Sequence, residues 1–391
     1  MRRSNNRGNG GRTVTSAFGM MVKVLLRIGL LLTALLGMVL VASAYGGHID
    51  PRISTKPSVL TLALPYLAMT MAVVAVLWLL LRQWRALILA VLSIAVSWPS
   101  IRVVCPMHLF PPKVKPEEEL LQFKVMTFNA QYFIYNEDEY WRNDNRAFDY
   151  LLDCDADLVM IQEGNAGHYL QQMPSVTDCY DKLKSKYPYR ADNKKTGNLS
   201  ILSRYPIEYE DKILDTDSNE CAVFYKMKIK GRELHIVNLH LQSLHLSGGD
   251  RELYLEYTSP HNMKEKIENR DKFRSSVWAK LSTAFKLRAD QADEVRARIE
   301  ELGENVIVCG DFNDTPCSYA YRTIRGKDFE DTYQDCGFGP EITYHENRFL
   351  FKIDHILYRG DMRAVNIERP SVKISDHYPL IATMIWNSKN S

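Results

Sequence analysis

Polar side chains that could hold a metal ion or move a proton follow an apolar run late in the chain. The stretch Val306 to Pro316 reads VIVCGDFNDTP, in which Asp311 and Asn313 follow the apolar residues and Gly310. Side chains two positions apart in an extended chain point to the same face, so Asp311 and Asn313 would project together from a strand end. Asp, Asn, Gly and Pro are also ordinary turn formers, so this stretch alone does not separate a site from a loop.

The same arrangement recurs along the chain, where other strand-like apolar runs end in a residue suited to metal binding or proton transfer. These residues are Asn129 after FKVMTF, Glu163 after DLVMIQ, His240 in IVNLHLQS, Asp354 in FLFKIDHIL, and Asp376 with His377 in KISDHYPL. Turn formation does not explain so many polar strand ends. We therefore expect these side chains to share one site.

In order and content these blocks resemble the endonuclease/exonuclease/phosphatase superfamily, and the chain looks like a membrane-anchored bacterial-type member. Pancreatic-type deoxyribonucleases, abasic-site endonucleases, inositol polyphosphate phosphatases and neutral sphingomyelinases share this fold. The resemblance covers residues 123–385. It implies a four-layered α/β sandwich, in which helices flank two packed mixed β-sheets and the site lies where the strand ends of both sheets meet.

The resemblance also implies a role for each matched residue. Asn129 matches the family's first Asn, Glu163 its metal-binding Glu, His240 its phosphate-contacting His, Asp311 and Asn313 its GDFN pair, Asp354 the Asp that orients a His, and Asp376 with His377 its terminal SDH. None of the matched positions is substituted. This favours an enzyme over a binding protein that kept the fold and lost turnover.

Phosphoester hydrolysis needs such residues on chemical grounds. The negative charge of a phosphodiester repels a nucleophile, so the site needs a hard divalent cation. Mg²⁺ and Mn²⁺ are such cations, and they prefer carboxylate and carboxamide oxygens. Glu163 is the first-choice ligand, with Asp376 and Asn129 beside it.

Two residues could activate the attacking water. A histidine oriented by a carboxylate is the usual general base, which favours His377 held by Asp354. The resemblance also permits Asp311 to hold or deprotonate the water. The sequence does not decide between them.

Two further residues would stabilise the charge that develops on the phosphate. His240 would donate a hydrogen bond to a phosphate oxygen, and Asn313 would do so from a neutral amide. A protonated His240 needs a carboxylate neighbour that raises its pKa. Glu220, just before an apolar strand-like run, is the candidate.

Residues 1–110 differ in composition from the rest and are predicted to be a membrane region. The apolar segments are 22–44, 60–81 and 86–104. Each approaches the roughly 20 residues that a spanning helix needs. Pro99 and Arg102 are expected to interrupt the end of the third.

Basic residues set the expected orientation. Four of them, Arg2, Arg3, Arg7 and Arg12, precede the first segment. The other two, Arg82 and Arg85, lie between the second and third segments. The positive-inside rule then places the amino terminus in the cytoplasm and, after three spans, the remaining chain outside it, in the plasma or inner membrane. If the third segment does not cross the membrane, the chain that follows it lies in the cytoplasm instead. Ala42-Ser43-Ala44 could alternatively be a signal-peptide cleavage site.

A proline-rich linker over 111–120 leads into one expected catalytic domain over 121–391. The predicted strands are 123–128, 158–161, 199–202, 222–229, 234–241, 306–309, 349–357 and 380–385, and the main helical patterns are 144–152 and 276–302. This irregular order favours a two-sheet sandwich over a regular βαβ repeat. Arg288 and Gln291 could project toward a substrate, but the solvated face of the second helix is the favoured place for them.

Charge narrows the choice of substrate. Residues 1–112 hold 11 Lys or Arg and one acidic residue, whereas the rest holds 38 basic and 46 acidic residues, a net charge of −8. Proteins that follow a nucleic-acid backbone usually have a basic face, so DNA and RNA are disfavoured. We expect a phosphodiester or phosphomonoester that is small or lipid-borne. An extracytoplasmic endonuclease or exonuclease is the alternative.

Overall fold

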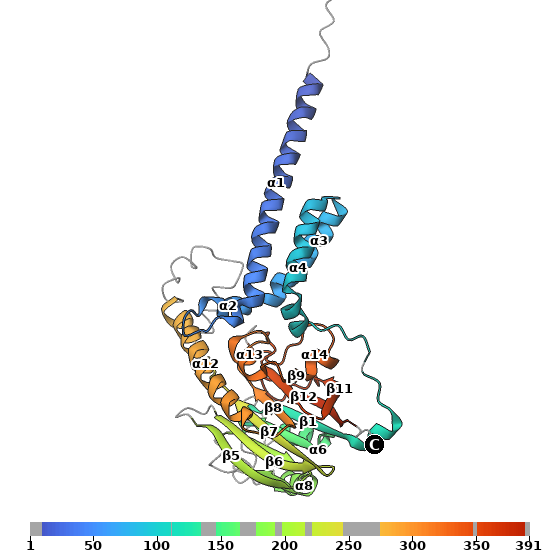
Figure 1. Cartoon of the computed structure of the whole chain (residues 1–391), viewed down its shortest axis with the longest axis vertical. Coiled ribbons are helices and arrows are strands. Elements are labelled where there is room, and N and C mark those ends of the chain that lie inside the picture. Colours follow the sequence, from blue (N-terminus) through green and yellow to red (C-terminus); the bar gives the residue numbers. More distant parts are fainter. Residues whose placement is uncertain are drawn as a thin grey trace, which may run out of the picture. The chain divides into compact units, whose positions relative to one another are not determined.

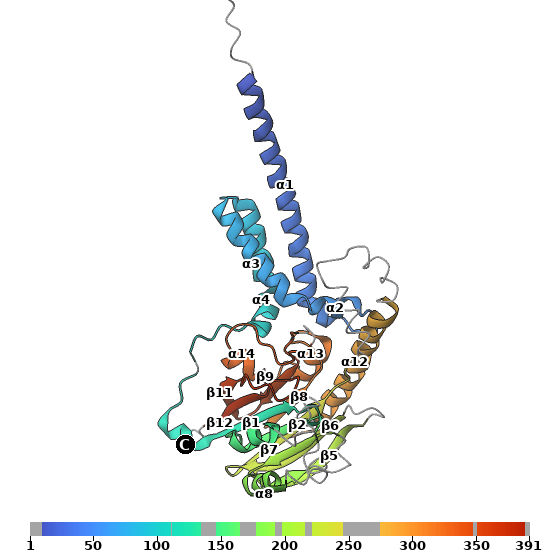
Figure 2. The same cartoon turned by 180° about the vertical axis from the view of Figure 1, so that it is seen from behind.

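The structure, a computed structural model, describes residues 10–110, 112–133, 146–164, 177–191, 198–215, 221–244, 274–346 and 350–387. The chain divides into two compact units (Figures 1 and 2). The first comprises Met1–Tyr45 and Ala63–Ile101, and the second comprises Gly46–Leu62 and Arg102–Ser391. The segment Gly46–Leu62 therefore folds with the second unit, although both of its neighbours in the sequence belong to the first.

The first unit consists of apolar helices. They are α1 (Gly10–Tyr45), α3 (Leu64–Leu80) and α4 (Trp84–Val104). Residues 18–48 and α4 are long and apolar enough to cross a membrane, with mean hydropathies of 2.5 and 2.0, whereas α3 has 17 residues. The second predicted span starts later than expected, because Pro65 stands in the first turn of α3, where a proline ends any preceding helix. The expected interruption of the third is wrong, since α4 continues through Pro99.

Small and polar side chains let α1 and α3 pack closely. Trp78 donates from Nε1 to Thr33 Oγ1 at 2.9 Å, and a Cβ at Gly29 would lie only 2.6 Å from the Trp78 ring. Large apolar side chains such as Leu31 and Val73 are 69% and 68% exposed. Exposed apolar faces of this extent mark a surface that contacts a membrane or another protein.

The second unit is built on two mixed sheets of six strands, in the orders β11-β12-β1-β2-β4-β3 and β5-β6-β7-β8-β10-β9. The strands are β1 (Gln122–Asn129), β2 (Leu158–Gln162), β3 (Tyr189–Ala191), β4 (Ser200–Ser203), β5 (Ile207–Asp215), β6 (Cys221–Ile229), β7 (Arg232–His240), β8 (Val306–Asp311), β9 (Glu330–Asp331), β10 (Asp354–Arg359), β11 (Met362–Glu368) and β12 (Leu380–Trp386). Among these strands, β1 with β2 and β7 with β8 pair in parallel, and the other pairs are antiparallel.

Helices cover the outer faces of the two sheets. The helices of this unit are η1 (Gly46–His48), α2 (Lys56–Thr61), η2 (Pro116–Leu121), η3 (Gln131–Phe133), α6 (Arg146–Asp153), α8 (Thr177–Lys186), η6 (Arg274–Trp278), α12 (Ala279–Glu300), α13 (Tyr319–Arg325) and α14 (Thr332–Cys336). Side-chain alternation in β1 buries both faces of its sheet: Phe123 and Val125 pack between the sheets, and Met126 and Phe128 pack with residues of α6 and α8. On the other side α12 packs against β5 and α13. The expected four-layered α/β sandwich is confirmed.

The eight predicted strands are all present to within a few residues, although the run 349–357 becomes a strand only at Asp354. The four strands that the sequence did not predict are β3, β5, β9 and β11. They are the four edge strands of the two sheets. Edge strands are commonly short or charged, which hides the apolar pattern on which such predictions rest.

Candidate active site

Strand pairing brings polar strand ends together. In the second sheet, His240 of β7 lies beside Asp311 of β8, and Asp311 lies beside Asp354 of β10. In the first sheet Asn129 ends β1, and Glu163 follows the adjacent strand β2. The ends of the two sheets meet, since Asn129 Nδ2 donates to Asp311 Oδ2 at 3.0 Å and to Glu163 Oε1 at 3.2 Å.

A buried pair of amides fixes the two sheets to each other next to these residues. Gln162 donates from Nε2 to Asn238 Oδ1 at 2.6 Å, and Asn238 Nδ2 donates to the carbonyls of Ile161 and Ser200 at 3.1 and 3.2 Å. Both amides are fully buried. Sequence reasoning missed them, although each is a lone amide inside an apolar run.

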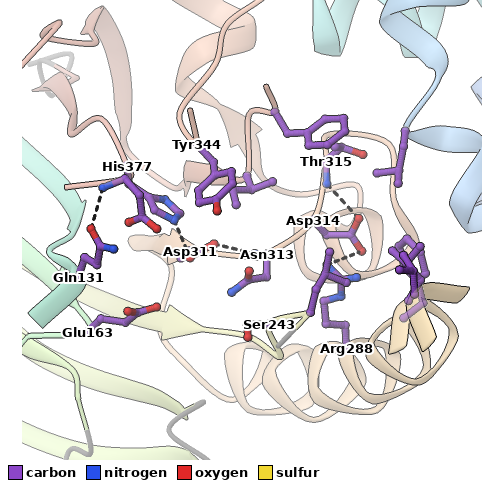
Figure 3. Close-up of a pocket in the computed structure, with 18 of the residues that line it drawn as sticks. Gln131, Glu163, Ser243, Arg288, Asp311, Asn313, Asp314, Thr315, Tyr344 and His377 are labelled. Carbon is purple, nitrogen blue, oxygen red and sulfur yellow. Dashed lines mark hydrogen bonds and ion pairs between the residues drawn. The ribbon is translucent and has the colours of Figure 1, made fainter. Parts of the chain in front are cut away.

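His377 enters the site from the segment before β12 (Figure 3). Its Nδ1 lies 2.8 Å from Asp354 Oδ2 and its Nε2 lies 3.7 Å from Asp311 Oδ2. Burial opposes a charge on His377, but the carboxylates of Asp354 and Asp311 outweigh it and raise the pKa of His377 to about 10. Burial in turn raises the pKa of Asp311. The two carboxylates thus favour the protonated, imidazolium form of His377.

His240 is 4% exposed and lies between two carboxylates. Its Nε2 is 3.5 Å from Glu163 Oε1 and 3.7 Å from Asp311 Oδ2. Within the described part of the chain, neither ring nitrogen has a hydrogen-bond partner. Glu220, the predicted neighbour, lies outside the described residues. Among the described residues this buried histidine has only the two longer carboxylate contacts, which points to a further group that would complete the site.

Carboxylates gather where a cation would balance their charge. Burial raises the pKa of Asp376, and the nearby carboxylate of Glu163 raises it further although His377 opposes this. Asp311, Asp354 and His377 place potential ligand atoms within 4.8 Å of one another. An oxygen-rich set of this kind fits Mg²⁺ or Mn²⁺. Of the predicted ligands, Glu163 and Asp376 offer oxygens, whereas Asn129 Oδ1 accepts from the backbone N–H of Gln131 at 3.1 Å.

Asn313 is held by the backbone around it. Its N–H donates to Asp311 Oδ1 at 2.8 Å, and its Nδ2 donates to the carbonyl of Leu241 at 3.0 Å. Asn313 and Glu163 have positive φ values of 51° and 47°. Such conformations are costly for non-glycine residues and cluster at functional sites.

A cavity of about 500 Å³ opens onto this cluster. Five predicted residues line it, namely Glu163, Asp311, Asn313, Asp376 and His377. The other three, Asn129, His240 and Asp354, lie beside these lining residues, at the distances given above, and do not line the cavity themselves. The structure thus brings all eight predicted residues together.

Sequence reasoning misjudged one wall of the cavity. Arg288 and Gln291 are 2% and 5% exposed, so their expected place on a solvated helix face is wrong. Arg288 lines the cavity, with Nη1 3.7 Å from Oδ2 of buried Asp314, and Gln291 Oε1 accepts from the N–H of Gln242 at 2.8 Å. Charged and amide groups at helical spacing resemble a solvated face unless their buried partners are known.

Comparisons with known proteins found similar chains among the solved structures. Solved structures similar to the chain include an endonuclease/exonuclease/phosphatase from Bacteroides vulgatus, with 20% identity over 68% of this chain and 99% of that chain and a TM-score of 0.45. A mannosyl-6-phosphatase from Bacteroides thetaiotaomicron has 16% identity over 68% and 100%, with a TM-score of 0.44. Sphingomyelinase C from Streptomyces griseocarneus has 17% identity over 67% and 99%, with a TM-score of 0.40. No curated protein sequence matches the chain.

Two family models match the sequence. One, described as a domain of unknown function, matches residues 23–104. The other, described as the Endonuclease/Exonuclease/phosphatase family, matches residues 126–377, more than half of the chain and nearly all of the two sheets. The chain therefore belongs to the endonuclease/exonuclease/phosphatase family.

Proposed function

We propose that the chain is a membrane-anchored phosphoesterase that depends on a divalent cation, with its catalytic domain in residues 121–391 outside the cytoplasm. Members of this family hydrolyse phosphoester bonds. The observation that carries the proposal is the convergence of carboxylates and two histidines on one cavity, where the strand ends of both sheets meet. The lack of a hydrogen bond from His240 to any described residue supports a site built to receive a further group.

The geometry supports a division of roles. Glu163 and Asp376, with Asn129 beside them, would hold the cation. When bound, the cation would polarise the phosphoryl oxygens and stabilise the leaving group. Asp311, whose pKa is raised by burial, is the better proton acceptor for the attacking water. His377 would donate from Nε2 to the phosphate, because Asp354 keeps it protonated.

Two further residues would stabilise the negative charge that develops on the phosphate in the transition state. His240 lies between Glu163 and Asp311 and would donate to a phosphate oxygen or orient these carboxylates. Asn313 would donate its second amide hydrogen, since the first is bound to Leu241. Both roles need only small shifts of side chains already at the cavity.

The apolar helices support the membrane anchor. Two of them are long and apolar enough to cross a bilayer, and large apolar side chains of α1 and α3 are exposed. The four arginines before residue 22 and the two between the apolar segments 60–81 and 86–104 favour the amino terminus and that link on the cytoplasmic side. The net charge of −8 beyond residue 112 favours a small or lipid-borne phosphoester over nucleic acid.

Hydrolysis by the purified full chain in detergent tests this proposal. The substrates are bis-p-nitrophenyl phosphate, p-nitrophenyl phosphate, RNA and plasmid DNA, each with Mg²⁺, Mn²⁺ or EDTA. Asp311→Ala serves as the blank, and Glu294→Gln, a change of an exposed carboxylate on α12, serves as the matched control. We expect cation-dependent turnover that Asp311→Ala lacks and Glu294→Gln keeps. No turnover of any substrate by a folded, cation-binding protein would refute the proposal.

A further inference from the structure

The cavity has two chemically different sides. Glu163, Asp311 and His377 lie together in one part of the cavity, apart from Arg288 and Asp314 (Figure 3), and apolar side chains make up much of the remaining lining. The apolar residues include Leu62, Val277, Leu281, Phe285, Phe351 and Ile353. A phosphate needs only the first side. The second would suit a hydrocarbon attached to it.

One apolar strip comes from the start of the long helix. Val277 of η6 and Leu281 and Phe285 of α12 are spaced four residues apart, which puts them on one face of a helix. One side of the Phe285 ring is already occupied, because the Arg288 guanidinium lies 4.6 Å from its centroid. The remaining strip is mainly aliphatic, and it therefore offers a poor stacking platform for a nucleobase.

Leu62 belongs to a segment that the sequence places between two apolar helices. We call residues Gly46–Leu62, which join α1 to α3, the connector. Arg52 of the connector donates to Asp290 at 2.9 Å, to Asp293 at 2.6 Å and to the Tyr319 hydroxyl at 3.1 Å. These contacts attach the connector to α12 and α13.

Two more contacts fix the connector along its length. The hydroxyls of Thr55 and Ser282 lie 3.1 Å apart, and Ser282 follows the cavity residue Leu281. Near its start, a Cβ at Gly47 would lie 1.8 Å from the carbonyl oxygen of Cys317, so only glycine allows this approach. The connector is thus built into the domain that holds the site.

We infer that the connector is a specificity element of the active site, in which Leu62, with the strip on α12, binds the hydrocarbon part of an amphiphilic phosphoester. The inference rests on the proposed function and names its substrate class. Leu62 is half-buried, so an alkyl group of the substrate that packs on it removes further apolar surface from water. Leu62 is also two residues from the first residue of α3. The chain therefore links the substrate-binding wall directly to an apolar helix.

Two phosphodiesters that differ only in the alkyl group test the inference. Methyl p-nitrophenyl phosphate and octyl p-nitrophenyl phosphate release the same leaving group, so the ratio of their kcat/KM values reports alkyl binding. With the full chain in detergent, the octyl ester should be preferred by about 100-fold. Leu62→Ala should lower this ratio by about 5-fold and Leu62→Met should restore it. Leu287→Ala, an equal truncation at an exposed position of α12 outside the cavity, should leave the ratio unchanged.

Each failure has a separate meaning. If neither ester is hydrolysed with Mg²⁺ or Mn²⁺ present, the proposed function itself is refuted. If both are hydrolysed with equal kcat/KM, the function stands and the hydrocarbon subsite is refuted. If the wild-type ratio is high but Leu62→Ala and Leu287→Ala both leave it unchanged, the connector has no part in specificity.

Discussion

At the scale of single residues, the proposed roles separate groups that would hold a cation from groups that would move protons. Glu163→Gln should raise the Mg²⁺ concentration for half-maximal activity by at least about 10-fold, because it removes a carboxylate ligand. His377→Gln should lower kcat by about 1,000-fold while changing that concentration little, because it removes a proton donor. Titration of activity with Mg²⁺ measures both. An equal loss of cation affinity in the two variants would contradict the assigned roles.

A second residue-scale prediction concerns the buried pair of Arg288 and Asp314. Arg288→Leu would leave the Asp314 carboxylate buried without the guanidinium that pairs with it, which should lower the free energy of unfolding by about 3 kcal/mol. The midpoint of thermal unfolding should then fall by roughly 8 °C. Arg288→Leu combined with Asp314→Leu should recover most of the loss, because no unpaired charge remains. Arg298→Leu, in an exposed pair, is the control and should change the midpoint little. A double variant no more stable than the single one would refute this account.

At the scale of elements, the sequence predicted the inner strands and the site residues at their ends. Those strands are apolar throughout because both faces of each sheet are covered, so they are visible as local runs. The edge strands β5 and β11 carry charges such as Glu208, Asp211 and Arg363, so their pattern is hidden. Neither the strand order nor the pairing of His240 with Asp311 follows from local pattern, because pairing depends on contacts between distant segments.

The junction between the two sheets gives a prediction at this scale. Asn238→Leu removes an amide that bonds to Gln162 and to the carbonyls of Ile161 and Ser200, and leaves these buried groups unsatisfied. The free energy of unfolding should fall by about 3 kcal/mol. Because Glu163 and Asp311 come from different sheets, kcat should also fall even though Asn238 does not line the cavity. Thermal unfolding and steady-state kinetics measure the two effects. Full activity in a destabilised Asn238→Leu variant would show that the junction does not position the site.

At the scale of the whole molecule, the sequence predicted the order of regions but not the role of the connector. The apolar pattern places Leu60–Leu62 in a predicted membrane span and predicts no element for Gly46–Val59. The connector's attachment depends on Arg52 meeting Asp290, which lies 238 positions away. No local pattern carries such a contact. The site was predictable because its residues lie at or next to apolar runs, whereas the connector has no such marker.

The orientation of the chain gives the last prediction. The arginines before residue 22 and the pair Arg82 and Arg85 should stay in the cytoplasm, so three crossings would place Ser391 outside. In spheroplasts of a Gram-negative host, protease added outside should remove a tag at Ser391 and spare one at Met1. A cytoplasmic marker protein that stays intact would show that the membrane is sealed. The crossing of α3 is the step most open to failure, because its 17 residues extend about 25 Å, less than the roughly 30 Å hydrocarbon core. A protected tag at Ser391 would mean that one helix does not cross, and the cation site would then face the cytoplasm.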